Sequence, residues 1–242
     1  MKNFYSGFLI SILVWFNPPP KHTVIIDLVT KVKIHDGGSW LSNRVQFTNC
    51  DSALFFKTTQ IVLKCLRKYP SSFFKRKLKN IYIYKSILVD SVSFGGTFDD
   101  RDIYISQRDG IEYIENIFHH EFLSILVNHN GGKIKESHWY AINQKRFKYS
   151  DPTGGYEYLK IYKTSIPCFD TAYLKEGFLS NYSKSSIDND MSRFAENLFL
   201  STPEFWAAVD KFDAVRKKAT LLINFYHKLN PIFTETYFRQ LK

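Results

Sequence analysis

The sequence has few cysteines, and their spacing excludes two classes of site. Among 242 residues only Cys50, Cys65 and Cys168 are cysteines, and no two of them form a Cys-x-x-Cys pair. A zinc ribbon or a redox dithiol needs that pair, so both are excluded. Cys50 and Cys65 could pair in an oxidising compartment, although two free thiols are the simpler expectation. Nucleotide and flavin fingerprints are missing too, because Gly95-Gly96 and Gly154-Gly155 are isolated turn pairs.

Acidic side chains are in the minority. The chain has 23 Asp and Glu against 33 Lys and Arg, which gives a formal net charge of +10. Such an excess can mark a surface that binds a polyanion. The lysines are spread along the chain, however, and no helix-turn-helix, zinc-knuckle or ribonucleoprotein-type motif accompanies them. We therefore expect a solvated basic surface and no nucleic-acid partner.

Long apolar runs are also missing, apart from a short one near the N-terminus. Lys2 precedes an apolar run over residues 7–16, and three prolines follow at 18–20. Ten residues are too few to span a bilayer comfortably, but a charge followed by such a run is typical of an export signal. We interpret residues 1–20 as an export signal or anchor. This predicts an exported or cell-envelope protein that can associate with a membrane through residues 7–16.

Two features of the same segment favour a different interpretation. No small-x-small cleavage site precedes the prolines, and no cysteine follows that could carry a lipid. The alternative is a buried core segment in a cytoplasmic protein. An export segment predicts that Phe8, Leu9 and Leu13 are exposed or detached, whereas a core segment predicts that they are buried.

The chain does have ample material for a packed core. Hydrophobic residues make up 44% of it and aromatic residues 17%, which is enough for one domain over residues 21–242. Alternating and 3.6-residue apolar periodicities predict the elements of its first part, to about residue 130. These are strands at residues 23–34, 80–91 and 101–107, a helix capped by Asp51 and closed by Pro70, and a helix at residues 111–127. The second part, residues 131–242, is expected to be loop-rich to residue 187, with helices at 188–200, 203–210, 214–228 and 231–241.

The stretch IFHHEFLSIL, residues 117–126, carries the candidate chemistry. A His-Glu-x-x-His helix places two zinc ligands on one face, and its Glu takes a proton from zinc-bound water. His120 and Glu121 fit the first ligand and the general base, but Ser124 stands where the second histidine would be. A neutral hydroxyl is a poor zinc ligand beside imidazole or carboxylate. The helix therefore belongs to a metal enzyme with altered ligands, to a protein that has lost its metal, or to an unrelated fold.

The neighbouring histidines offer no simple replacement ligand. His119 points about 100° away from His120 around the helix axis. It has Glu115 four residues before it, but a His-Glu pair at that spacing is more often a surface salt bridge than a metal site. His129 lies nine residues after His120, and no glycine between them could turn the chain back early.

Residues 117–126 and 176–200 together resemble the zinc-binding metallopeptidase family of bacteria. These are gluzincin-type zincins, exported and often lipid-anchored. In the family the His-Glu helix is followed by a Tyr-containing stretch and by a helix start of the Glu-Asp-Phe-Ala-Glu kind, whose leading Glu is the third zinc ligand. The resemblance covers about residues 64–238. It implies a zincin-like α+β fold, in which a small mixed sheet packs on the helix carrying His-His-Glu, the C-terminal part is helical, and residues 101–107 form the edge strand that aligns extended peptides.

Carried onto this sequence, the family pattern implies a degenerate zinc site. Tyr182 matches the Tyr-containing stretch, and residues 190–192 match Asp-Phe-Ala. The third-ligand position then holds Asn189, and Arg193 stands where the motif has its second Glu. Ser124 and Asn189 thus both replace strong ligands, and the Arg193 charge would repel a cation placed nearby.

If the zinc site is degenerate, we expect the altered positions to lie together. His120, Ser124 and Asn189 should converge around a solvent-filled position, with Glu121 beside it. Neutral Ser and Asn side chains would satisfy one another or water there.

Three functions are compatible with these residues. The first is a zincin-fold protein that has lost ordinary zinc hydrolysis and binds a peptide, a glycan or a partner protein. The second is an active metallohydrolase with ligands rearranged around His120 and Glu121, for which His119, Asp190 and Asp188 are the alternatives. The third is a non-enzymatic α+β binding protein for an anionic or protein surface. Zinc is the one cofactor that the sequence suggests.

Overall fold

The computed structural model describes residues 9–13, 25–29, 44–74, 76–130, 133–151, 153–162 and 169–241. The chain divides into two compact units, Met1–Phe118 and His119–Lys242. The boundary falls inside helix α2 (Ile114–Asn130), after its first turn. Strands and helices together confirm the expected α+β class. No helix in these ranges is long and apolar enough to cross a membrane.

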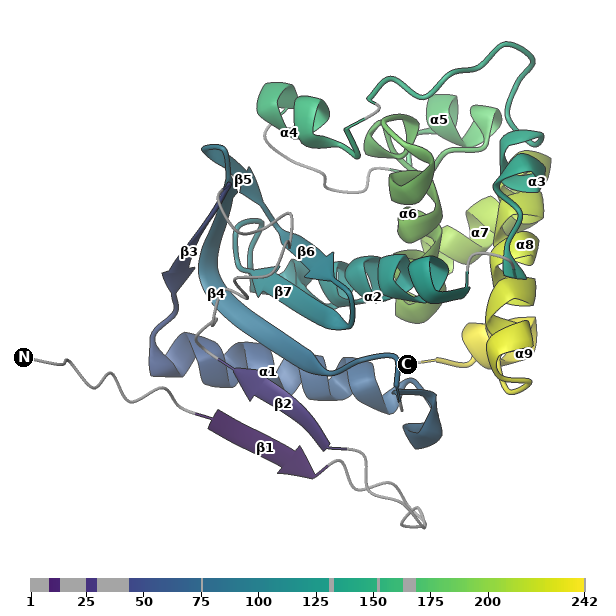
Figure 1. Cartoon of the computed structure of the whole chain (residues 1–242). Helices are drawn as coiled ribbons and strands as arrows, with labels where there is room; N and C mark the ends of the chain where they lie inside the picture. Colours follow the sequence, from purple (N-terminus) through teal and green to yellow (C-terminus); the bar gives the residue numbers. More distant parts are fainter. Residues whose placement is uncertain are drawn as a thin grey trace, which may run out of the picture. The chain divides into compact units, whose positions relative to one another are not determined.

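The described strands of the first unit form one mixed sheet (Figure 1). They are β1 (Leu9–Leu13), β2 (Ile25–Val29), β3 (Val45–Asn49), β4 (Asn80–Val89), β5 (Val92–Phe94), β6 (Gly96–Asp99) and β7 (Asp102–Ser106). The order across the sheet is β1-β2-β4-β7-β6, and β3 and β5 also pair with β4. The long strand β4 is the spine of the sheet. Its first half pairs in parallel with β2 and β7, and its second half pairs antiparallel with β3 and β5.

The expectation that residues 101–107 form an edge strand is wrong. Strand β7 lies between two others, because Tyr104 pairs with Tyr82 of β4 and with Thr97 of β6. A tight turn at Asp100, whose φ is +46°, returns β6 antiparallel into β7. Strand β6 has only four residues and begins with glycine, so its sequence carries too little alternation to predict a strand. The predicted pairing between the strands at 80–91 and 101–107 is confirmed.

Part of the predicted export segment belongs to the sheet. Leu9–Leu13 pairs antiparallel with Ile25–Val29, which in turn pairs in parallel with β4. The backbone of residues 9–13 is therefore not detached, whereas the exposure of the Phe8, Leu9 and Leu13 side chains lies outside what the structure describes. Phe8, the prolines at 18–20 and both ends of the strand expected at 23–34 lie outside the described residues. Export or anchoring stays a prediction.

Helix α1 (Ser52–Arg67) begins where the sequence predicts. The Asp51 carboxylate accepts a hydrogen bond from the Leu54 N–H at 2.8 Å, an N-cap contact that stabilises a helix by about 1 kcal/mol. Lys64 and Arg67 in the last turn face the negative end of the helix dipole. The buried face of α1 contacts β4 and consists of Phe55, Thr58, Thr59, Val62, Cys65 and Leu66.

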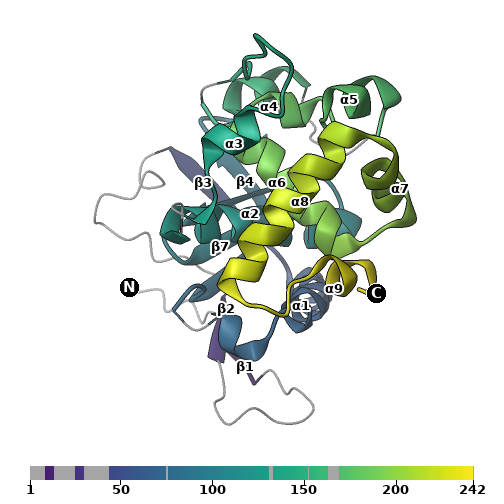
Figure 2. The ribbon, with the colours of Figure 1, turned by 90° about the vertical axis from the view of Figure 1, so that its right-hand side faces the viewer.

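The second unit is built from helices. After α2 they are α3 (Glu136–Tyr140), α4 (Tyr156–Tyr162), α5 (Thr171–Glu176), α6 (Ile187–Leu200), α7 (Pro203–Lys211), α8 (Asp213–Leu229) and α9 (Glu235–Arg239). Helix α8 contacts α5, α6 and α7, and α9 contacts α6. Figure 2 shows α8 as a long yellow helix that runs past α6 and α7. The helices predicted at 188–200, 203–210 and 214–228 are confirmed, whereas the one expected at 231–241 shortens to α9.

Helix α6 positions the residues of the candidate site. The Ser186 hydroxyl caps it by accepting from the Asn189 N–H at 3.1 Å, and Asp188 and Asp190 lie in its first turn, where the helix dipole favours negative charge. Five of its apolar residues are buried: Met191, Phe194, Ala195, Leu198 and Phe199. Its polar residues from Asn189 to Asn197 are buried as well. Buried polar groups need hydrogen-bonding partners, and these partners define the site.

Candidate functional site

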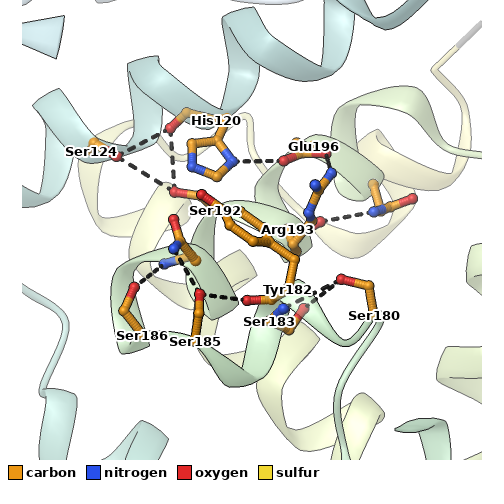
Figure 3. A network of polar contacts seen from close by, with 12 residues as sticks. His120, Ser124, Ser180, Tyr182, Ser183, Ser185, Ser186, Ser192, Arg193 and Glu196 are labelled. Atoms are coloured by element: carbon orange, nitrogen blue, oxygen red, sulfur yellow. Dashed lines mark hydrogen bonds and ion pairs between the residues drawn. The ribbon is translucent and has the colours of Figure 1, made fainter. Parts of the chain in front are cut away.

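A chain of charged contacts links α2 to α6 (Figure 3). His120 Nδ1 of α2 lies 2.7 Å from Glu196 Oε1 of α6. Arg193 Nη1 donates to the other carboxylate oxygen, Glu196 Oε2, at 2.6 Å. The side chains of Arg193 and Glu196 are only 4% and 1% exposed. Both oxygens of the Glu196 carboxylate are therefore bonded, one to the buried Arg193 and one to His120, whose side chain is 15% exposed.

Two serine hydroxyls lie beside this chain. Ser124 Oγ, one helical turn after His120, donates to the His120 carbonyl at 3.3 Å and lies 3.5 Å from Ser192 Oγ of α6. Ser192 Oγ also donates to the His120 carbonyl, at 3.3 Å. Helix α6 thus presents Ser192 to the position where a His-Glu-x-x-His helix has its second histidine.

Asn189 has different partners. Its side-chain amide donates to Ser185 Oγ at 2.9 Å and to the Gly154 carbonyl at 3.2 Å. Within the described ranges no hydrogen bond joins it to His120 or Ser124. The neighbouring Gly155 has a φ of +97°, and a Cβ there would lie 2.5 Å from Asn189 Nδ2. Asn189 therefore holds the glycine turn against α6. The residues of α6 that contact His120 and Ser124, where Asn189 was predicted, are Ser192 and Glu196.

The sequence contains a signal for Glu196 that the alignment on Asn189 misses. Residues 192–196 read Ser-Arg-Phe-Ala-Glu, and the last three equal the last three of the family's Glu-Asp-Phe-Ala-Glu. This alignment places Ser192 at the third-ligand position and keeps Glu196 as the second Glu of the motif. The alignment on Asn189 retains only Asp190. The contacts of Ser192 with Ser124 and His120 favour the alignment on Ser192.

The titrating groups of the site influence one another. Burial lowers the pKa of His120, but the hydrogen bond to Glu196 and the charges of Glu121 and Glu196 outweigh it and raise this pKa above its ordinary value. Burial raises the pKa of Glu121 to about 7, and the charge of His120 opposes that rise. No hydrogen bond to the Glu121 carboxylate occurs in the described part of the chain. A carboxyl group with a pKa near neutrality suits a general acid or base.

Asp190, an alternative ligand from the sequence, is engaged elsewhere. Its Oδ2 accepts from Lys218 Nζ at 2.6 Å, from Trp139 Nε1 at 2.8 Å and from the Tyr149 hydroxyl at 2.9 Å. The side chains of Asp190 and Lys218 are both fully buried. This ion pair connects α6 to α8. The Asp190 carboxylate is already paired with the Lys218 ammonium group, which lies where a metal ion would have to bind.

The other alternative ligands lie in different surroundings. The His119 ring is fully buried and stacks on Phe199, with ring centroids 4.5 Å apart and planes 9° apart. The pKa of Asp188 is raised by desolvation, and the charge of His120 opposes that rise. His119 therefore belongs to the aromatic core of the second unit, and Asp188 is a second acidic residue of α6, besides Glu196, whose charge interacts with that of His120.

Glu115 is a counter-ion for lysines in the first unit. Its carboxylate lies 2.6 Å from Lys68 Nζ and 3.5 Å from Lys64 Nζ. Cys65 of α1 is a buried free thiol, and Cys50 is free as well. Burial, together with the charge of Glu115, raises the pKa of the Cys65 thiol well above its ordinary value. Both cysteines were expected to be free, and Cys65 stays a neutral, unreactive thiol.

The donor set around His120 does not fit zinc. In the described ranges His120 belongs to no group of three His, Cys, Asp or Glu ligand atoms that lie within 4.8 Å of one another. A catalytic zinc needs three protein ligands. This site offers one imidazole, two neutral hydroxyls and the carboxylate of Glu196, whose oxygens are both bonded. The nearby charge of Arg193 adds repulsion toward a divalent cation.

Comparisons with known proteins place the fold. No protein-family model matches the sequence, and no curated protein matches it. A solved structure shares this fold. It is the crystal structure of a "putative zinc-binding metallo-peptidase" from Bacteroides caccae ATCC 43185, with a TM-score of 0.53 and 15% sequence identity, covering 80% of this chain and 77% of that chain. At this identity the likeness shows a metallopeptidase-like fold, and the site has to be argued from its own residues.

Proposed function

We propose that the chain is a degenerate relative of the bacterial zinc-binding metallopeptidases that binds a peptide or a partner protein without ordinary zinc hydrolysis. One observation carries the proposal: Ser124 Oγ and Ser192 Oγ lie 3.5 Å apart beside His120. In the family motif these two positions hold a histidine and a glutamate. Two neutral hydroxyls replace two strong ligands, so His120 is the one ligand of the family motif that remains, and one ligand does not hold zinc.

Several polar groups of the site bond to one another in the absence of an ion. The Glu196 carboxylate lies between the Arg193 guanidinium and the His120 imidazole. The two serine hydroxyls both donate to the His120 carbonyl. A buried network whose members are bonded in this way is stable and rigid. The fold is thereby kept while the metal becomes unnecessary, as expected of a protein retained for binding.

A second candidate function is an active metallohydrolase with rearranged ligands. Glu121 favours it, because a buried carboxyl group with a pKa of about 7 and no hydrogen bond in the described residues suits a general base. His120 and Asp188 would then be ligands. The first proposal is preferred because these groups do not form a three-ligand cluster.

We also propose that the protein is exported or attached to the cell envelope. Export or attachment to the cell envelope through residues 7–16 agrees with the family's properties and with the N-terminal sequence. Fractionation of cells that express the full chain tests this part. Recovery in the envelope or outside the cell supports it, and recovery with cytoplasmic markers contradicts it.

Restoring the ligands tests the proposed function most sharply. We compare Ser124→His/Ser192→Glu with the matched control Ser124→His/Asn189→Glu, both of which keep Arg193 paired with Glu196, and measure zinc affinity by competition with a chelator. The first variant should gain stoichiometric zinc and the control should not. The reason is that Ser124 and His120 of α2 contact Ser192, whereas no hydrogen bond in the described ranges joins them to Asn189. If only the control binds zinc, Asn189 is the ligand position. If neither variant binds zinc, the descent of this site from a zinc site is contradicted.

A further inference from the structure

We propose that Arg193 is a resident cation, whose guanidinium supplies within this chain the positive charge that a metal ion supplies in a zinc site. It neutralises Glu196 and, through Glu196, fixes the imidazole of His120. The inference rests on the proposed function only in that zinc is not the native partner of His120. The site depends on the Arg193 side chain, and its removal leaves a place where an added cation stabilises the fold.

The geometry sets Arg193 at one end of a three-residue chain. Arg193 and Glu196 are three residues apart on α6, so their side chains lie on the same face. Arg193 Nη1 bonds to one carboxylate oxygen of Glu196 at 2.6 Å, and His120 Nδ1 bonds to the other at 2.7 Å. Figure 3 shows this chain running from Arg193 through Glu196 to the His120 ring.

Burial makes the charge of Arg193 necessary. The Glu196 side chain is 1% exposed, and an ionised carboxylate in such a place is strongly destabilising unless a cation pairs with it. His120 is a titrating group, whereas a guanidinium stays charged at every pH at which proteins fold. Arg193 is therefore the permanent counter-charge in this chain of contacts.

Arg193 is also held from a second side. Its guanidinium carbon lies 5.1 Å from the ring centroid of Tyr182, a distance at which the ring face attracts a cation. The Tyr182 ring is in turn 6.3 Å from the ring of His120. The family's tyrosine position thus contacts the arginine, which lies between the aromatic ring and the carboxylate.

Removal of the guanidinium should leave a latent cation site. His120 and Glu196 would then present an imidazole nitrogen and a carboxylate oxygen 2.7 Å apart, both of them donor types that zinc prefers. Two such ligands bind zinc weakly, but the loss of the guanidinium charge beside the buried carboxylate adds an electrostatic attraction for a cation. The expected consequence is that the folded state becomes stabilised by zinc, which wild-type protein does not need.

The experiment measures thermal unfolding of chelator-treated protein, with and without added zinc, for four forms. These are the wild type, Arg193→Met, Arg193→Met/Glu196→Gln and the charge-conserving control Arg193→Lys. Arg193→Met should lower Tm by roughly 10 °C, and the added Glu196→Gln should recover at least half of that loss because no buried charge remains. Arg193→Lys should lose less than Arg193→Met. Zinc should raise the Tm of Arg193→Met by several degrees and leave the other three forms unchanged.

Both the recovery and the zinc effect are required. If Arg193→Met/Glu196→Gln is as unstable as Arg193→Met, the arginine acts through packing on Tyr182 and the proposal is overturned. It is also overturned if zinc stabilises the wild type and Arg193→Met equally. Should Arg193→Met fail to fold, the double variant decides: a folded double variant supports the counter-charge role, and an unfolded one refutes it. The zinc content of untreated wild type separately tests the proposed function, so the two failures are distinguishable.

Discussion

Replacement of Lys218 by methionine tests how strongly the buried ion pair holds α6 in place. Lys218 Nζ lies 2.6 Å from Asp190 Oδ2, and neither side chain is exposed. Its neighbour Lys217 provides a matched control, because its Nζ also lies 2.6 Å from a carboxylate, that of Asp213, but the two side chains are 59% and 76% exposed. The two pairs therefore share a distance and differ in burial.

The two substitutions should have very different costs. Lys218→Met leaves the Asp190 carboxylate buried without its cation, which typically destabilises a protein by about 3–5 kcal/mol. Trp139 and Tyr149 still donate to Asp190, so we expect the lower half of that range. Lys217→Met should cost about 0.5 kcal/mol or less, because exposed pairs are screened by water. For a chain of this length the loss in Lys218→Met corresponds to a Tm lower by roughly 10 °C.

The loss in Lys218→Met should also depend on pH. Burial raises the pKa of Asp190, and the charge of Lys218 opposes that rise. Without Lys218 the pKa of the folded state lies further above the unfolded value of about 3.9. The folded state then stays protonated while the unfolded state ionises, so stability is retained below pH 4 and lost as the pH rises through the folded pKa. The deficit should be smaller at pH 4 than at pH 7.

Urea unfolding of both variants, and of Lys218→Met/Asp190→Asn, provides the assay. The double variant should recover at least half of the lost free energy of unfolding, since no charge remains to be buried. The reasoning is refuted if Lys218→Met and Lys217→Met are equally stable, or if the deficit of Lys218→Met is the same at pH 4 and pH 7.

Two further predictions concern the histidine helix. Burial raises the pKa of Glu121 to about 7. Its contribution to stability is therefore complete below the unfolded pKa of about 4.3 and is lost as the pH rises through 7. Glu121→Gln should shrink the difference in urea midpoint between pH 5 and pH 8, and an unchanged difference would show that Glu121 does not cause this pH dependence. His119 stacks on Phe199 in the core, so His119→Ala should lower the free energy of unfolding by about 3 kcal/mol. The substitution should not change zinc affinity, and a loss of zinc affinity would show that His119 is a ligand.

Local signals in the sequence predict most helices and the main strands. The Asp51 cap and the basic last turn delimit α1, and apolar periodicity with caps delimits α6 to α8. Pairing between strands is less predictable because it depends on residues far apart in sequence. Nothing in Gly96–Asp99 marks it as the neighbour of β7, and nothing in Leu9–Leu13 indicates that it pairs with β2.

The candidate site is predictable only in part, for a similar reason. The sequence identifies His120, Glu121 and Ser124 through their spacing on one helix. The partner residues on α6 depend on helix rotation, and a shift of three residues in the alignment exchanges Asn189 for Ser192. The pairing of Asp190 with Lys218 joins positions 28 residues apart, and no local pattern reveals it.

The central claim is that the position beside His120 holds no zinc, and the metal content of purified wild-type protein tests it most directly. The protein is incubated with equimolar zinc, dialysed, analysed for bound metal, and compared with His120→Ala. The account predicts far less than one zinc per chain in the wild type, with the same amount in His120→Ala. One zinc per wild-type chain that disappears in His120→Ala would contradict it and establish a metal site with rearranged ligands.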